Sequence, residues 1–238
     1  MKSPFLSFRV AVACCGLAAV LVPAVAAPSA PPPTTRAGQT ELTPAAALQR
    51  LVEGNARFVA GQPWARDWAR ERSTTADGQF PFAVVLSCID SRASSEIVFD
   101  QGLGEIFNAR VAGNIVNDDV LGSMEFACQA AGAKLIVVVG HSACGAVKGA
   151  AAGVKLGNLT GLLERIQPAV AAARAKQPNL APTDGAFVES ATELNVREAM
   201  RQIRERSPVL RALLDAGKVR LVGGVHDLAT GRVTFLAD

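Results

Sequence analysis

The chain has 238 residues, 50% of them hydrophobic and 19% charged, which is enough apolar material to bury a sizeable core. Its 24 lysines and arginines are nearly balanced by 21 acidic residues. This balance excludes the strongly basic surface that is typical of nucleic-acid-binding proteins.

The first 26 residues have the layout of an export signal. Lys2 and Arg9 precede an apolar run from Val10 to Val22, and small residues lead up to Ala26. The run of 13 residues is shorter than the ~20 that a membrane-spanning helix needs, which argues against a membrane anchor. We therefore expect residues 1–26 to be a signal peptide, and the mature protein to be periplasmic or secreted.

Residues 27–43 are rich in proline, alanine, serine and threonine. Such a composition buries little apolar surface, and it predicts a flexible leader. Residues 44–238 are expected to form a single domain. Its first element is predicted to be an amphipathic helix from Thr43 to Gly61, because apolar residues recur there at helical spacing.

Short apolar runs then predict four buried strands, at residues 82–87, 105–111, 135–140 and 219–225. Helical patterns are found between them, at residues 120–131, 145–152, 161–176 and 187–206. This alternation predicts an α/β fold with a mainly parallel sheet that is flanked by helices. Residues 231–236 follow the last of these strands at hairpin distance and are expected to add an antiparallel edge strand.

Reactive side chains follow two of the predicted strands. Cys88, Asp90 and Arg92 alternate directly after the first strand, and His141 and Cys144 follow the third. Ligand sites in open parallel sheets lie at the carboxyl ends of the strands, so these side chains are expected to meet there. Two thiolates and an imidazole are ligands that Zn²⁺ prefers.

The cysteine count supports a metal rather than disulfides. Cys14 and Cys15 lie in the expected signal, which leaves Cys88, Cys128 and Cys144 in the mature protein. An odd number of cysteines argues against a disulfide framework. Each cysteine taken alone could be a buried apolar residue, and this is the interpretation for Cys128. Taken together, Cys88, His141 and Cys144 predict one zinc ion per subunit, with a fourth position open to water, as in catalytic sites.

Asp90 and Arg92 have more than one possible role. Asp90 could orient a zinc-bound hydroxide through a hydrogen bond, or it could ligate the zinc and displace the water. Arg92 could hold the carboxylate of Asp90 in a bidentate pair, and the alternative is an ordinary surface ion pair. Whether Asp90 ligates zinc at neutral pH stays open.

Two motifs resemble those of the β-class carbonic anhydrases, Cys-x-Asp-Ser-Arg at residues 88–92 and His-x-x-Cys-Gly at residues 141–145. Similarity to this family extends through residues 53–58, 99–104, 112–114 and 195–196, and the signal and leader lie outside it. The resemblance implies zinc ligation by Cys88, His141 and Cys144, with Asp90 as the gating carboxylate and Arg92 as its partner. It also implies reversible hydration of carbon dioxide to bicarbonate and a proton, and a homodimer in which the first helix reaches over a neighbour. A homotetramer is left open.

The sequence leaves several alternatives. A carbonyl sulfide or carbon disulfide hydrolase could use the same site, and a zinc-stabilised dimer or bicarbonate sensor without catalysis is a further candidate. The chain also departs from the usual pattern of the family, with Ala93-Ser94 in place of Val-Pro and Asn108-Ala109 in place of Val-Val. His226 stands where tyrosine is common. It could be a proton shuttle or, more simply, a hydrogen-bonded histidine at a strand end.

Overall fold

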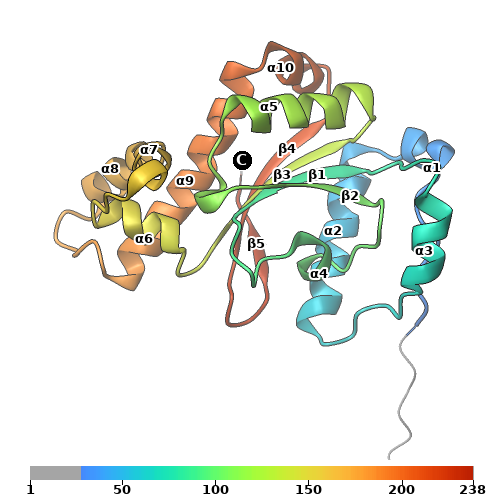
Figure 1. The fold of residues 1–238 in the computed structure, drawn as a ribbon, viewed down its shortest axis with the longest axis horizontal. Helices are drawn as coiled ribbons and strands as arrows, with labels where there is room; N and C mark the ends of the chain where they lie inside the picture. The colour runs from blue at the N-terminus through green and yellow to red at the C-terminus, as the bar shows by residue number, and fades with distance from the viewer. Residues whose placement is uncertain (1–27, 238) are drawn as a thin grey trace, which may run out of the picture.

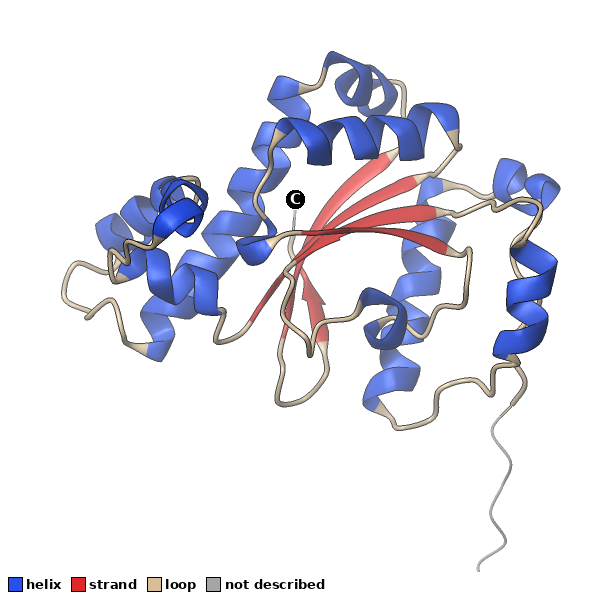
Figure 2. Ribbon diagram, in the orientation of Figure 1, coloured by secondary structure: helices blue, strands red, loops and turns tan. Residues whose placement is uncertain are grey.

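The structure is a computed structural model that describes residues 28–237, so the expected export signal lies outside the described residues. These residues are built around a five-stranded sheet with the strand order β2-β1-β3-β4-β5 (Figures 1 and 2). Four strands run parallel and β5 runs antiparallel to β4. The predicted fold class is confirmed. The strands are β1 (Ala83–Ser87), β2 (Ile106–Arg110), β3 (Leu135–His141), β4 (Arg220–His226) and β5 (Val233–Phe235).

Burial along the strands follows their place in the sheet. Every residue of the central strands β1 and β3 is buried, as their continuous apolar runs predict. β2 was expected to be buried as well, but of its five residues only Ile106 is buried. The reason is that β2 lies at the edge of the sheet and pairs with β1 on one side only.

Helices cover both faces of the sheet (Figure 1). On one face, α5 (Asp118–Glu125), α9 (Gly185–Arg206) and α10 (Pro208–Asp215) pack on Val84, Leu86 and their neighbours. On the other face lie α2 (Pro44–Val59) and α4 (Ser95–Val98). The predicted first helix is α2, and the side chain of Thr43 caps it by accepting from the Ala46 amide. Among the helices of residues 28–237, α9 is the longest at 22 residues, and none is long and apolar enough to cross a membrane.

A third group of helices lies beyond the carboxyl ends of the strands and packs on α9. It contains α6 (Gly145–Ala151), α7 (Gly157–Glu164) and α8 (Gln167–Lys176). The prediction of one helix over residues 161–176 is wrong, because the chain forms α7 and α8 with a break at residues 165–166. Pro168 lies in the first turn of α8. Proline has no N–H for a helical hydrogen bond and its ring clashes with the preceding turn, so it starts a helix more readily than it continues one.

Shorter elements complete the chain. The helix predicted at residues 120–131 begins earlier, where the side chain of Asn117 caps α5, and it continues after α5 as a π-helix, η2 (Phe126–Ala130), that buries Cys128. α3 (Trp68–Thr75), α4, α10 and a short 3-10 helix, η1 (Ala112–Asn114), were not predicted. The segment at residues 178–185 is a loop between α8 and α9, apart from Gly185, which begins α9.

The prediction of a flexible leader is wrong for residues 28–43. This segment contains α1 (Arg36–Glu41), and Ser29 forms a parallel bridge with Ala65. The Thr34 hydroxyl donates to the Glu105 carboxylate (2.8 Å), and the buried Gln39 amide donates to two backbone carbonyls. Composition describes how little apolar area a segment can bury, but it does not describe specific polar contacts with the rest of the chain.

Candidate metal centre

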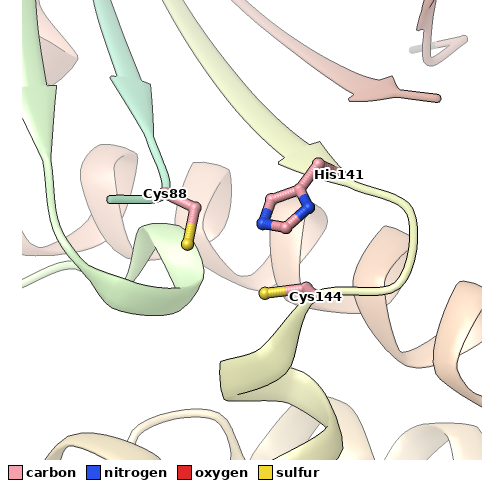
Figure 3. A group of neighbouring side chains, drawn as sticks. All are labelled: Cys88, His141 and Cys144. Carbon is pink, nitrogen blue, oxygen red and sulfur yellow. The ribbon is translucent and has the colours of Figure 1, made fainter. Parts of the chain in front are cut away.

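Strand order brings the two reactive motifs together. β1 and β3 are neighbours in the sheet, and Ser87, the last residue of β1, pairs with Val139. Cys88 follows β1 directly, and His141 is the last residue of β3. Figure 3 shows the side chains of Cys88, His141 and Cys144 directed toward one another from the ends of these strands and the start of α6.

A compact turn carries Cys144 to His141. The Ser142 amide donates to the His226 carbonyl (2.9 Å), and the Ser142 hydroxyl accepts from the Leu228 amide (3.0 Å), which ties the turn to β4 and its hairpin. Ala143 has a φ of +56°, in the left-handed region that residues with a side chain rarely adopt. Cys144 is then the N-cap residue of α6, with no capping hydrogen bond from its side chain. The turn is strained, and the contacts of Ser142 hold it.

The three ligand atoms lie within 4.8 Å of one another, and the residues are 5%, 1% and 1% exposed for Cys88, His141 and Cys144. His141 Nδ1 is 3.0 Å from the Ser142 carbonyl, which requires the proton on Nδ1 and leaves a lone pair on Nε2. Nε2 is buried and has no hydrogen-bond partner among residues 28–237. A buried lone pair that faces two cysteines fits a divalent cation, and the donor set is one that Zn²⁺ prefers.

The surroundings of Cys88 favour its thiolate. The Cys144 thiol beside it lowers the pKa of Cys88, with help from the Gly113 amide, which donates to the Cys88 sulfur (3.3 Å). The pKa of Cys144 is raised in turn by the Cys88 sulfur and by burial. A cation between the sulfurs would stabilise both thiolates.

Asp90 and Arg92 form a bidentate pair at this centre. Arg92 donates to Asp90 through Nε (2.9 Å to Oδ1) and Nη2 (2.8 Å to Oδ2), and its amide donates to Oδ1 (3.0 Å). Arg92 thereby holds the pKa of the Asp90 carboxyl well below its usual range. Asp90 Oδ2 lies 3.9 Å from His141 Nε2, but Asp90 is outside the group of three clustered ligands. The structure thus brings all five predicted residues together and places Asp90 beside the three others that could hold a metal.

Sequence reasoning missed Arg110 and left the role of His226 open. Arg110, at the end of β2, donates to the carbonyls of Cys88 and Asp90 (3.0 and 2.6 Å). Sequence offered no signal for it, because its place beside the end of β1 depends on the pairing of β2 with β1. His226 pairs with His141 in the sheet and is 3% exposed, and neither ring nitrogen has a hydrogen-bond partner in the described part of the chain. Burial lowers its pKa. His226 thus stands at a strand end, as expected, with no protein partner for its ring in residues 28–237, and both interpretations of its role stay predictions.

Comparisons with known proteins agree with this geometry. The sequence model of the carbonic anhydrase family matches residues 83–233. "Carbonic anhydrase 2" of Mycobacterium tuberculosis is 38% identical over 199 residues, which cover 81% of this chain and 92% of the relative.

Solved structures show the same fold. One of two tetrameric beta-carbonic anhydrases from the ascomycete Sordaria macrospora is similar, with a TM-score of 0.65 and 25% identity over 70% of this chain and 85% of the other. A Coccomyxa beta-carbonic anhydrase in complex with acetazolamide also has a TM-score of 0.65, with 27% identity over 70% of this chain and 76% of the other. The chain belongs to the carbonic anhydrase family, and within it to the β class of these enzymes.

Proposed function

We propose that this chain is a zinc-dependent enzyme that catalyses the reversible hydration of carbon dioxide to bicarbonate and a proton. The observation that carries the proposal is the convergence of two cysteines, an unpartnered imidazole nitrogen and an arginine-held carboxylate at the ends of β1 and β3. Membership of the carbonic anhydrase family supports the same reaction.

Cys88, His141 and Cys144 would hold the zinc ion, and three protein ligands leave a position for water or substrate. Bound there, Zn²⁺ would supply a hydroxide nucleophile by lowering the pKa of water. Two thiolate ligands neutralise more of the charge of the ion than three histidines do, so the bound water would be a weaker acid than at a three-histidine site. We therefore expect turnover to rise toward alkaline pH.

Asp90 is suited to orient the nucleophile. An ionised carboxylate only accepts hydrogen bonds, and the Arg92 guanidinium keeps Asp90 ionised and fixed in direction. Asp90 Oδ2 can accept the remaining proton of the attacking oxygen and leave a lone pair of that oxygen facing the carbon. No proton has to leave Asp90 in this role.

The same pair could act as a gate. The Arg92 side chain is 61% exposed, and ion pairs this exposed contribute little to stability because solvent screens them, so the pair can open. A released Asp90 carboxylate would be free to turn toward His141 and take the position that water needs. The proposed enzyme would then have an active state with Asp90 on Arg92 and an inactive state with Asp90 on the metal.

The test compares two aspartates that are each paired with an arginine. Asp90→Asn should keep about one zinc per subunit but lose turnover by about 10- to 100-fold, the usual cost of removing a partner of a metal site. Asp215→Asn breaks the exposed ion pair with Arg204 and should change neither the zinc content nor the turnover. Stopped-flow assays with carbon dioxide, carbonyl sulfide and carbon disulfide identify the substrate. A zinc-loaded parent that turns over only the sulfur compounds would refute the proposal.

We also propose a homodimer, and association of two such dimers would give a homotetramer. Large apolar side chains remain exposed on the single chain, with Ile97 at 63%, Phe126 at 58% and Trp68 at 54%. The Sordaria relatives are described as tetrameric. Light scattering of the purified protein gives the mass directly, and a monomer at micromolar concentration would contradict this assembly.

Export to the periplasm or beyond the cell is part of the proposal. It is supported by the signal layout of residues 1–26. Amino-terminal sequencing of the protein from the exported fraction should begin at Ala27. Recovery of the uncleaved chain from the cytoplasm alone would contradict it.

A further inference from the structure

We propose that Arg110 is a positioning residue. Its guanidinium holds the backbone of Cys88 and Asp90 in place and so sets both the zinc affinity and the orientation of the Asp90 carboxylate. This inference rests on the proposed function. Arg110 lies outside both zinc motifs, and its contacts with this backbone come from a different strand.

The Arg110 guanidinium donates hydrogen bonds to the segment after β1, at the point where backbone hydrogen bonding between β1 and β2 ends. The Val111 amide donates to the Ser87 carbonyl (3.1 Å), and the chain then turns into η1. The Gly113 amide is directed to the Cys88 sulfur (3.3 Å) rather than to a carbonyl of β1. Arg110 instead supplies donors from its side chain, with Nε to Cys88 O (3.0 Å) and Nη2 to Asp90 O (2.6 Å).

The segment that Arg110 holds has little packing of its own. Ile89, between the two carbonyls, is 61% exposed, so burial does little to fix this turn. The Asp90 carbonyl also accepts from the Ala93 amide (3.0 Å), but Arg110 is the contact that ties Cys88 and Asp90 to each other and to β2. A planar guanidinium offers two donors in a fixed relation, which the single ammonium of lysine does not.

Arg110 acts on the backbone rather than through the charge of Asp90. Within the described residues, the ion-pair contacts of the Asp90 carboxylate are with Arg92 and His141, and these two also account for its lowered pKa. The consequence of losing Arg110 should therefore be a loosened turn, with the Asp90–Arg92 pair still present.

The test uses the full mature chain. Arg110→Ala should raise the zinc dissociation constant, measured by competition with a chromophoric chelator, by about 10- to 100-fold. It should lower kcat with little change in KM, and the cobalt(II)-substituted protein should show an altered thiolate-to-metal absorption band. In the zinc-free protein, amide hydrogen exchange of residues 89–93 should be faster than in the parent.

Three controls separate geometry from charge and from folding. Arg110→Lys keeps the charge without the paired donors and should resemble Arg110→Ala. Added methylguanidinium should restore part of the zinc affinity of Arg110→Ala, whereas methylammonium should not. Arg211→Ala, which removes an exposed arginine from α10, should match the parent in every measurement.

Two results would overturn the inference. The first is an Arg110→Ala protein with the zinc affinity, cobalt spectrum and kcat of the parent. The second is full recovery by Arg110→Lys, which would make charge the relevant property. The parent is measured first, because a parent that binds no zinc or does not hydrate carbon dioxide refutes the proposed function instead.

Discussion

Gln39 offers a sharp test of how the amino-terminal segment is held. Its side chain is 6% exposed, and Nε2 donates to the carbonyls of Pro81 (2.7 Å) and Ala131 (2.8 Å), just before β1 and just after η2. A hydrogen bond contributes about 1 kcal/mol net, so Gln39→Ala should cost about 2 kcal/mol of unfolding free energy. For a domain of this size, that corresponds to a fall in Tm of about 4–8 °C.

Gln49 is the matched control, because it is an exposed glutamine of α2 whose Nε2 donates to Glu53 on the surface (2.9 Å). Gln49→Ala should change the unfolding free energy by less than about 0.5 kcal/mol. Urea unfolding at fixed protein and zinc concentrations measures both variants. Equal midpoints for the two variants would refute the idea that the amide of Gln39 anchors this segment to the sheet.

The remaining predictions concern Cys128, Gly113 and the metal. Burial raises the pKa of the Cys128 thiol to about 12, so iodoacetamide at pH 8 should leave it unmodified in the folded protein and alkylate it in urea, as read by mass spectrometry. The pKa of Cys128 is higher in the folded protein than in the unfolded chain. Its contribution to the free energy of unfolding is therefore complete below about pH 8.5 and is lost as pH rises toward 12. Gly113 has a φ of +68°, and an added Cβ would lie 2.6 Å from Ile166 Cδ1, so Gly113→Ala should cost about 1–3 kcal/mol in urea unfolding. A chelator should lower the Tm of the parent but not of His141→Gln, since zinc at 100 times its Kd adds about 2.7 kcal/mol to the free energy of unfolding. An equal response of both proteins to the chelator would place the metal elsewhere.

Much of the fold and the candidate centre follows from local patterns. Continuous apolar runs predict strands that are buried on both faces, and β1 and β3 are such strands. Ligand sites in parallel sheets gather at the carboxyl ends of the strands, which is why the sequence alone predicts that residues 88–92 and 141–145 lie together. The identity of the side chains then limits the chemistry, because two sulfurs and an imidazole favour zinc over harder cations.

Other features depend on contacts between distant parts of the chain, and only the tertiary structure decided them. The order of residues 28–43 rests on the partners of Thr34 and Gln39, which lie 42 to 92 residues away. Arg110 reaches the zinc motif only because β2 pairs with β1, and the burial of His226 follows from its register with His141. Sequence by itself determined which side chains could do chemistry and near which strand ends they stand, because those properties are local. Which backbone atoms and neighbours hold them was decided by strand order and register, which depend on the packing of the whole chain.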